Sequence, residues 1–541
     1  MSEPTIDSPT GPGMTALYCD FLADGPRLKS YLTADDPVRV SDKVATGGVD
    51  RAVMSHILRE QNEQFQSKTK CFDAIDRLER DDAVCIFGGQ QAGLFGGPLL
   101  TLYKAIDIVK RADRLEKDIG RPVVPVFWIA CDDHDFEEIN HTHYVDRKGG
   151  LGRIIYGKGQ EPSVPVAEIC LKDDSVYEQL KTAAGEAFGG TDFSDELLKR
   201  LMGAYAPENC LVKAFARHLA DILPDSGLVF FCPHSKEIKS LSGTFFREII
   251  ERRPALKDRL EKTATRLIDD GYHIQAEKKE SAVHLFYHHP RRTPIHHDDD
   301  SFLIGEKRLS RTELLKLIDD YPDRFSPDVL TRPVWQSWLF PVVAQTGGPA
   351  EIAYFCQIGG LFELFGLSQP YYYARASATL VEKRTADLMH KLDIEFSDLT
   401  GDVEQLINRI AARSFPEDVD ERIREFRERF REEFDRFAAS MVDFAGNLKP
   451  MADQTYGKME YALKNFEKKI FSEHKRQTTT VRNQIYRLAD SLYPEKNLQE
   501  RVLNINYFIS KYGFGLVDYV MKRLDIEDRE HQMISLADFT D

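Results

Sequence analysis

The chain has 541 residues, of which 42% are hydrophobic and 34 are Gly, so a mostly disordered or collagen-like protein is excluded. At about 150 residues per domain, this length predicts three or four structural units. Lys and Arg number 72 against 88 Asp and Glu, which gives a formal net charge of −16. A net acidic chain disfavours non-specific binding to nucleic acid or to an anionic membrane surface.

The amino-terminal residues MSEPTIDSPTGPG are acidic and have no apolar core, so they do not resemble a signal peptide. No run of about 18 apolar residues occurs, and we expect no membrane span. The eight Cys are scattered without a CxxC pair, which predicts reduced, mostly buried thiols rather than a zinc ribbon. Together these features predict a cytoplasmic protein.

The first part of the chain alternates between strand-like and helical patterns. Residues 83–87 (AVCIF) and 123–130 (VVPVFWIA) are apolar runs, and between them the apolar residues of 98–117 fall on one helical face. A strand, a helix and a strand within about 50 residues predict a βαβ unit with a right-handed crossover. Further strands are predicted at Leu228–Cys232, Val283–Tyr287, Leu339–Ala344 and Pro370–Ala374. The sequence therefore predicts an α/β fold with a parallel-sheet core and insertions at about 146–222 and 288–330.

The pattern changes after residue 402. Apolar residues spaced by three and four cover 423–448 and 459–470, and Pro450 lies between the two runs. This spacing predicts two long antiparallel helices that form a coiled-coil arm. The predicted organisation is a core, the arm and a C-terminal segment that packs back on the core: 1–385, 386–495 and 496–541.

The second predicted helix of the arm is basic. Between Lys458 and Arg487 there are eight Lys or Arg and three Glu. These bases either pair with the acidic first helix or bind a phosphate-bearing ligand, such as a nucleotide, or a partner's acidic surface. The candidate nucleotide-binding residues are Lys464, Lys468, Lys475 and Arg482.

The most informative motif is GGQQAGLFGGPLLTLYKA at 88–105, where glycines lie between a strand and a helix. Glycines such as Gly93, Gly96 and Gly97 let backbone N–H groups approach a ligand, and the free N–H groups of a helix start favour an anion. The spacing matches neither GxGxxG nor a Walker A loop. A tight strand-to-helix turn without a ligand is the alternative.

The second strand runs into a motif dense in carboxylates and imidazoles, FWIACDDHDFEEINHTH at 127–143. Parallel strands end at the same edge of a sheet, so this motif and the glycine-rich turn are expected to meet where open α/β sheets bind ligands. His134, between Asp133 and Asp135, could be a general base that a carboxylate orients. A polar loop of solvated charges is the alternative, and because the spacing matches no common ligand set we predict no metal.

A third motif, RPVWQSWLFPVVAQTGGPAEIAYF at 332–355, repeats the Gly-Gly-Pro helix entry at Gly347 and Gly348. Two such helix starts could address two anionic groups. Glu351 and Tyr354 lie on one helical face, although Glu351 could simply interact favourably with the helix dipole. The Trp residues, including Trp128, are expected in the core or in a pocket wall.

These three motifs, with LQERVLNINYFISKYG at 498–513, resemble the bacillithiol-biosynthesis cysteine-adding enzyme family (BshC), a family of cysteine ligases. The resemblance covers essentially the whole chain, with Asp132 where the family is expected to have Glu. It implies a Rossmann-like core related to nucleotidyltransferases and class I aminoacyl-tRNA synthetases, and an arm used in homodimerisation. The HIGH and KMSKS signatures of those synthetases are absent from this sequence.

The implied reaction joins L-cysteine to glucosaminyl-malate through an amide bond, the last step to bacillithiol. A carboxylate is a poor acyl donor, so the cysteine carboxyl must be activated, and whether ATP or another nucleotide does this is left open. A base must then take the amine proton, and we assign this role to His134. Gln90, Gln91, Arg332 and Gln336 would position the substrate, with the planar Arg332 fork on the malyl carboxylate.

Two other functional classes stay open. One is a different synthetase-like ligase or nucleotidyltransferase that acts on another amine. The other is a coiled-coil scaffold with a degenerate core. The density of Gly, Asp, His and Gln at one sheet edge argues against the scaffold, since an inactive pocket needs none of these residues.

Overall fold

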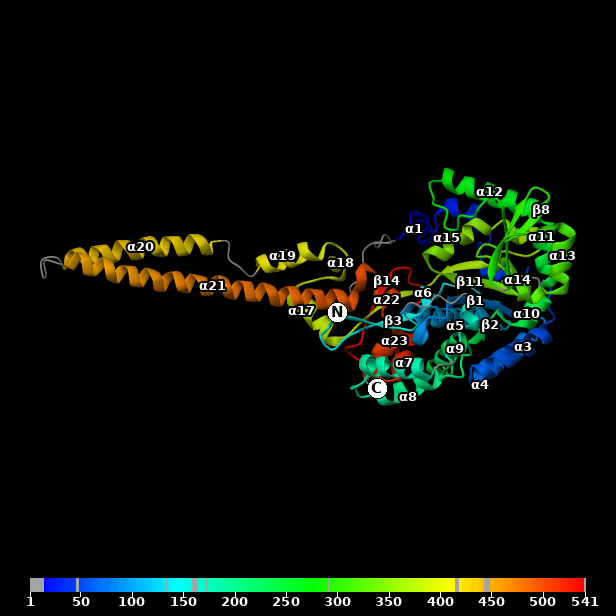
Figure 1. Ribbon diagram of the computed structural model, residues 1–541, viewed down its shortest axis with the longest axis horizontal. Coiled ribbons are helices and arrows are strands. Elements are labelled where there is room, and N and C mark those ends of the chain that lie inside the picture. Colours follow the sequence, from blue (N-terminus) through cyan, green and yellow to red (C-terminus); the bar gives the residue numbers. More distant parts are fainter. Residues whose placement is uncertain are drawn as a thin grey trace. The chain divides into compact units, whose positions relative to one another are not determined.

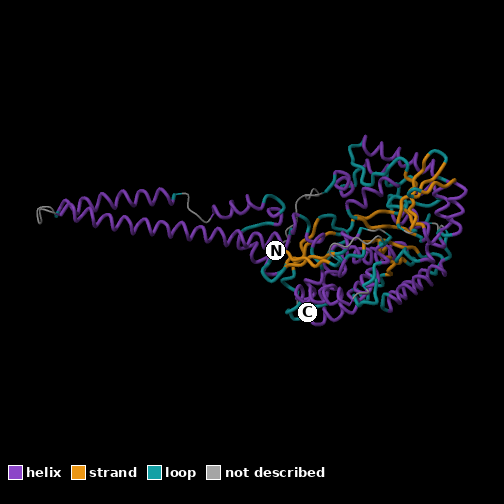
Figure 2. The backbone as a smooth tube through the Cα atoms, in the orientation of Figure 1, coloured by secondary structure: helices purple, strands orange, loops and turns teal. Residues whose placement is uncertain are grey.

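The computed structural model describes residues 14–44, 48–132, 135–157, 164–171, 174–289, 291–413, 418–441 and 448–539. The chain divides into two compact units. The first unit consists of 1–381 and 497–541, and the second consists of 382–496. Within the described residues the strands all belong to the first unit, and the second is helical (Figures 1 and 2).

A five-stranded parallel sheet forms the centre of the first unit, in the order β12-β11-β1-β2-β5. The pair β1 and β2 is in register from Val84 opposite Val123 to Gln91 opposite Ala130. The strands are β1 (Val84–Gln91), β2 (Val123–Ala130), β5 (Val229–Phe231), β11 (Val342–Gly347) and β12 (Tyr371–Ala374). This sheet confirms the predicted α/β, Rossmann-like core.

Both faces of the sheet are buried, because alternate residues of each strand enter different hydrophobic cores. In β1, Val84 and Ile86 pack into one core, and Cys85 and Phe87 pack into the other. The first core is completed mainly by α5 (Leu99–Ile119) and α9 (Leu211–Ile222). Helices contributing to the second are α3 (Arg51–Gln64), α4 (Thr69–Leu78), α11 (Gly243–Glu251), α14 (Arg332–Leu339) and α15 (Pro349–Ile358).

The predicted strand at Val283–Tyr287 does not belong to the parallel sheet. It lies in β6, which begins a separate antiparallel sheet of order β10-β6-β7-β8-β9. The reason is local: β6 turns directly into β7 as a hairpin, whereas a parallel partner would require a crossover. The strands are β6 (Ala282–His288), β7 (Arg292–Asp298), β8 (Ser301–Ile304), β9 (Lys307–Ser310) and β10 (Phe325–Pro327).

Shorter elements fill the connections of the first unit. Between β2 and α9 lie α6 (Phe136–Ile139), β3 (His141–Val145), β4 (Leu151–Ile155), η3 (Val166–Glu168), α7 (Asp174–Phe188) and α8 (Ser194–Ala204). After β5 come α10 (Lys236–Leu241), α12 (Arg253–Asp269), α13 (Arg311–Asp320), η4 (Pro322–Arg324) and α16 (Leu361–Leu364). The amino-terminal part holds α1 (Ala16–Leu22), η1 (Pro26–Ser30), α2 (Pro37–Ser41) and η2 (Leu94–Gly96).

The C-terminal segment returns to the first unit. Strand β14 (His531–Ser535) pairs in parallel with β13 (Ser377–Val381), in register from Ser377 opposite His531. The helices that precede it are α22 (Gln499–Val502), α23 (Ile505–Tyr512) and α24 (Gly515–Arg523). Leu503, Ile505 and other apolar residues of this segment join the same core as α5 and α9.

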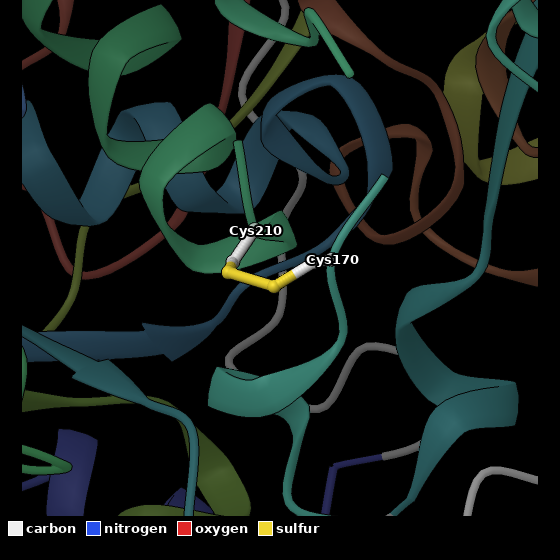
Figure 3. The surroundings of a disulfide bond; sticks show 2 residues. All are labelled: Cys170 and Cys210. Carbon is white, nitrogen blue, oxygen red and sulfur yellow. A yellow bond between two sulfur atoms is a disulfide. The ribbon is translucent and has the colours of Figure 1, made fainter. Parts of the chain in front are cut away.

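One pair of cysteines departs from the expectation that the thiols are reduced. Cys170 and Cys210 form a disulfide bond (Figure 3). The two residues are 40 positions apart in the chain, but an isolated antiparallel β-bridge brings their backbones together just before α9. Sequence spacing could not indicate this pair, because the contact depends on how the segment after η3 folds back.

The second unit contains the predicted pair of long antiparallel helices, α20 (Val419–Ser440) and α21 (Leu448–Leu492). Their antiparallel order follows from side-chain contacts: Arg427 pairs with Glu467, and farther along α20, Phe434 packs on Tyr456. The 45 residues of α21 correspond to about 68 Å at 1.5 Å per residue. The other elements are α17 (Lys383–Leu392), α18 (Phe396–Leu399), α19 (Val403–Arg413) and η5 (Pro494–Lys496). In the described part of the chain, no helix combines the length and apolar character needed to span a membrane.

Candidate active site

A cavity of about 750 Å³ opens at the carboxyl edge of the parallel sheet. Its wall is formed by the ends of β1 and β2, the first turns of α5 and α15, the start of α14 and the segment 275–278. This is the edge at which open α/β sheets bind ligands. The cavity lies at the edge that the sequence analysis predicted for a ligand, and the structure identifies which side chains line it.

A buried ion pair between Lys104 and Glu351 lies in the cavity wall. The Lys104 Nζ donates to Glu351 Oε2 at 2.6 Å, to the Gly89 carbonyl at 2.8 Å and to Gln90 Oε1 at 3.0 Å. Glu351 Oε2 also accepts from the Gly348 N–H at 2.9 Å. Burial lowers the pKa of Lys104, and the Glu351 carboxylate opposes that shift. The pair therefore joins the end of β1 to the start of α15 and fixes one carboxylate oxygen of Glu351.

Arg332 also lines the cavity, and its guanidinium is held by neutral groups. Its Nη2 donates to the Tyr354 hydroxyl at 2.6 Å, and its Nη1 donates to Gln336 Oε1 at 3.4 Å. Behind it, Gln336 Nε2 donates to Gln345 Oε1 at 3.2 Å. Within the described residues, no carboxylate forms an ion pair with Arg332. A positively charged fork is thus held in position with its charge available to a ligand.

A second buried ion pair, between Arg375 and Glu500, lies at the cavity. Arg375 and Glu500 are hydrogen-bonded, and Glu500 Oε2 also accepts from the Ala378 N–H at 3.0 Å. Burial acts to lower the pKa of Arg375, but the Glu500 carboxylate raises it above its ordinary value. Arg375 also lies beside Gly348, where an added Cβ would come within 3.4 Å of its Nε. Arg375 is therefore part of the cavity wall, although its charge is balanced by Glu500.

Cationic side chains outnumber carboxylates in the cavity wall. The cationic residues are Lys104, Lys278, Arg332, Arg375 and Arg501, and the carboxylates are Glu138, Glu277 and Glu351. The whole chain has the opposite sign, at −16. This local excess of positive charge favours an anionic ligand such as a carboxylate or a phosphate.

Most of the predicted substrate-binding residues lie on this cavity. They are Gln90, Gln91, Trp128, Arg332, Gly348, Glu351 and Tyr354. Gln336 and Gly347 are buried, and neither belongs to the cavity wall. Lys104 was missed, although it belongs to the motif at 88–105. The available signal was a single Lys on the otherwise apolar face of the predicted helix.

The three remaining glycines, Gly93, Gly96 and Gly97, are buried and do not line the cavity. Instead, the carbonyls of their turn point to the C-terminal segment. Asn504 Nδ2 donates to Gly97 O at 2.7 Å and to Phe95 O at 3.1 Å. Gly96 and Gly97 have φ of 91° and 72°, a region that favours glycine. The contacts described here thus explain these glycines through backbone conformation and packing, while ligand binding by them stays a prediction.

The predicted catalytic loop is described only in part. His134 and Asp133 lie outside the described residues. Asp135 is exposed and immediately precedes α6. Its assignment as an orienting carboxylate for His134 therefore stays a prediction.

The residue before this loop, Asp132, belongs to a cluster that the sequence analysis missed. Asp132 Oδ1 accepts from Lys239 Nζ at 2.8 Å and lies 2.6 Å from His234 Nδ1, while His234 Nε2 lies 3.1 Å from Glu168 Oε1. Despite burial, which would raise it, the pKa of Asp132 is held well below its usual range by Lys239 and His234. The partners come from 36 to 107 residues away, so spacing along the chain carried no signal.

The proposed nucleotide-binding residues lie on α21. Arg482 Nη1 donates to Glu404 Oε1 at 2.6 Å, and Lys464 lies 3.4 Å from Glu460 within its own helix. Lys468 is exposed, and the side chain of Lys475 lies outside the described residues. Two of the four bases therefore pair with carboxylates, and neither of those carboxylates lies in α20.

Among the residues that the structure describes, no group of three or more His, Cys, Asp or Glu side chains could hold a metal ion.

Two family models together match nearly the whole chain. The N-terminal Rossmann-like domain of bacillithiol biosynthesis BshC matches residues 5–376. The C-terminal coiled-coil domain of BshC matches residues 378–536. The chain belongs to the bacillithiol biosynthesis BshC family. This assignment confirms the resemblance on which the predicted fold and reaction class were based.

Curated relatives agree with the BshC assignment. The protein named "Putative cysteine ligase BshC" from Salinibacter ruber is 29% identical over 96% of this chain and 96% of its own length. The protein of the same name from Koribacter versatilis is 30% identical over 94% of this chain and 95% of its own. A crystal structure titled as a putative arginyl tRNA synthetase from Campylobacter jejuni covers 88% of this chain and 97% of its own at 9% identity, with a TM-score of 0.22. The names of the two curated relatives describe a cysteine ligase, which agrees with the ligase expected for this chain.

Proposed function

We propose that the chain joins the carboxyl group of L-cysteine to the amine of glucosaminyl-malate, and so forms bacillithiol in the last step of its synthesis. The observation that carries the proposal is the presence of both the Arg332 guanidinium and the Glu351 carboxylate in the wall of one cavity of a BshC family member. The first suits an anionic substrate group and the second suits an amine. Glucosaminyl-malate presents both.

Arg332 would bind a carboxylate of the malyl group. Its guanidinium is oriented by Tyr354 and Gln336, which are neutral, so a ligand carboxylate would be its charged partner. Burial raises the pKa of Tyr354 to about 12, which keeps the phenol neutral and able to orient Arg332 without cancelling its charge. A planar guanidinium can bind a carboxylate through two parallel hydrogen bonds, which a Lys cannot do.

Glu351 would bind the amine. Lys104 and the Gly348 N–H both contact Oε2, so the carboxylate is fixed through one oxygen. In the described residues no hydrogen bond to Oε1 is present, and Glu351 lines the cavity. Oε1 can therefore accept a hydrogen bond from an amine and orient its lone pair toward an acyl carbon.

The reaction needs two further contributions. The cysteine carboxyl must be activated, for example as an adenylate or an acyl phosphate, because a carboxylate is a poor acyl donor. A base must then remove a proton from the attacking amine, and His134 is the residue that we propose for this step. The positive wall of the cavity would stabilise the negative charge that develops on the acyl oxygen.

Purified protein incubated with cysteine, glucosaminyl-malate and ATP tests the proposal. Mass spectrometry should detect bacillithiol, and His134→Ala should lower turnover by about 10²-fold or more while the protein stays folded. Arg332→Lys keeps the charge but not the fork, and should raise the KM for glucosaminyl-malate. Arg247→Ala is the matched control, because Arg247 pairs with Asp319 outside the cavity.

This assay and a deletion strain together separate the alternatives. Product formation with another amine but not with glucosaminyl-malate would favour a different ligase. In a deletion strain, unchanged bacillithiol without accumulation of glucosaminyl-malate would exclude the proposed reaction and favour a scaffold.

We also propose that the chain forms a homodimer through the arm formed by α20 and α21. Large apolar side chains of the arm remain exposed in the single chain: Phe426 is 51% exposed, Phe437 62% and Phe466 62%. An apolar groove of about 280 Å³ lies between Phe426 and Phe466. A second copy of the arm would remove this surface from water, a gain of roughly 25 cal/mol for each Å² of apolar area.

Deleting residues 416–493 and closing the gap with a short linker tests the dimer. The full chain should scatter light as a dimer and the deletion variant as a monomer. A deletion variant that remains dimeric would place the interface on the first unit.

A further inference from the structure

Two free thiols lie side by side at the carboxyl edge of the sheet, outside the wall of the cavity. Cys131 follows β2 and Cys232 follows β5, and these strands are parallel neighbours. The two Sγ atoms are 3.4 Å apart. This position suggests that the two cysteines can form a disulfide bond, because such a bond requires two Cys residues whose backbones are already close together.

Hydrogen bonds fix the backbone at both cysteines. The Gln61 side chain contacts both polar groups of Cys232: it accepts from the Cys232 N–H at 2.9 Å and donates to the Cys232 carbonyl at 3.0 Å. The Cys131 carbonyl accepts from the Ala167 N–H at 3.2 Å. Bond formation would need the sulfurs to approach by about 1.4 Å, to the usual S–S length of about 2.05 Å. Rotation of the two side chains is the motion available on such a fixed backbone.

The two thiols differ in access to solvent. Cys232 is half-buried, whereas Cys131 is 1% exposed. Burial raises the pKa of the Cys131 thiol. Cys232 can therefore meet a small reagent, and Cys131 can be reached only by its neighbour.

We propose that Cys131 and Cys232 form a thiol–disulfide exchange site for a low-molecular-weight disulfide, RSSR. The Cys232 thiolate attacks one sulfur of RSSR, which releases one RS⁻ and leaves a mixed disulfide on Cys232. Cys131 attacks the Cys232 sulfur and passes its proton to the departing RS⁻, which leaves as RSH. The two protein thiols are oxidised to one disulfide, and RSSR is reduced to two RSH.

The two cysteines lie where a movement of Cys131 would affect the carboxyl end of β2. Cys131 directly precedes Asp132, whose carboxylate contacts both Lys239 and His234. Trp128, on the same strand, lines the cavity. Movement of the Cys131 side chain toward β5 would therefore act on a strand end that contributes to the cavity. The proposal does not depend on which amine the cavity binds.

The test uses the full-length protein and oxidised glutathione as RSSR. After incubation, free thiols are blocked by alkylation and peptides are mapped by mass spectrometry without reduction. The expected result is a peptide pair joined through Cys131 and Cys232, which dithiothreitol separates. The disulfide between Cys170 and Cys210 provides an internal reference, because it is present before the oxidant is added.

Two variants distinguish exchange from general oxidation. Cys131→Ser removes the resolving thiol, so Cys232 should retain one glutathione. Cys19→Ser is the matched control, since Cys19 is another half-buried cysteine, and this variant should still form the Cys131–Cys232 link. Circular dichroism checks that both variants fold. Failure of the wild-type chain to form the link, or a stable glutathione adduct on wild-type Cys232, would overturn the proposal.

Discussion

Glu500 in the first unit and Glu404 in the second unit make similar contacts in very different surroundings. Each carboxylate accepts from an Arg: Glu500 from Arg375, and Glu404 from Arg482. Glu500 is fully buried, whereas the Glu404 side chain is 48% exposed. Water and salt screen the second pair, so the same bond contributes far less to the free energy of unfolding.

The comparison shows that the first unit contains an ion pair held away from water, whereas the corresponding pair of the second unit is open to solvent. Buried pairs such as Lys104 with Glu351 fix the geometry of the cavity, and the loss of one partner would leave an uncompensated buried charge. The ion pairs within α20 and α21 are mostly exposed to solvent. Large apolar side chains of these helices, such as Phe426, Phe437 and Phe466, are exposed as well. This difference is expected when the first unit holds a preformed binding site and the second unit offers a surface for association.

The largest effect is expected for Glu500→Ala. Removal of this carboxylate leaves Arg375 buried without its charged partner and leaves the Ala378 N–H without its acceptor. The free energy of unfolding should fall by about 3–5 kcal/mol. Urea unfolding measures it, and a loss below about 1 kcal/mol would mean that Arg375 finds another partner or reaches water.

A smaller effect should appear with pH at His218. Burial lowers the pKa of His218 to about 4, so the folded chain holds it neutral while the unfolded chain protonates near pH 6.5. The unfolded state then binds more protons below pH 6.5, and stability falls as the pH drops from about 6.5 to 4, by up to about 3 kcal/mol. His218→Leu should lose that part of the acid sensitivity in urea unfolding at pH 7 and pH 4.5. Equal pH dependence in both proteins would contradict this.

Gly97→Val should lower stability by about 1–3 kcal/mol, because φ is 72° and an added Cβ would lie 3.1 Å from Thr101 Oγ1. Thermal unfolding measures the loss. Gly185→Ala is the control, since nothing lies within 4 Å of a Cβ at that helical position. If Gly97→Val keeps its melting temperature but loses ligand binding, the turn approaches a ligand as first predicted.

The smallest effect is expected for Glu404→Ala in α19 of the second unit. Its partners Arg482 and Tyr486 are exposed and can exchange the carboxylate for water. The urea midpoint should stay within experimental error of the wild type. A loss as large as that of Glu500→Ala would show that exposure does not explain the contrast between the two units.

The sequence predicted the features that depend on local patterns. Apolar runs and helical periodicity predicted β1, α5 and β2, and the rule that parallel strands end at one edge predicted that the glycine-rich turn and the motif at 127–143 lie at the same edge of the sheet. The sequence could not predict contacts between distant segments, such as Arg375 with Glu500 or Asp132 with Lys239, because pairing between segments leaves no trace in local spacing. The strand predicted at Val283–Tyr287 is present as β6, but its sheet could not be predicted for a related reason. Its apolar run is compatible with either sheet, and only the following hairpin decides between them.

The glycine turn and Asn504 have a consequence for protein synthesis. Asn504 Nδ2 contacts Gly97 O across a separation of 407 residues. At about 5–20 residues per second, a ribosome needs roughly 20–80 s to add the asparagine after it has made the glycine. Throughout that interval the turn carbonyls lack this donor. A prematurely terminated chain could not complete the turn at the entrance to α5, so the amino-terminal motif reaches its final form only when the distal part of the gene has been translated.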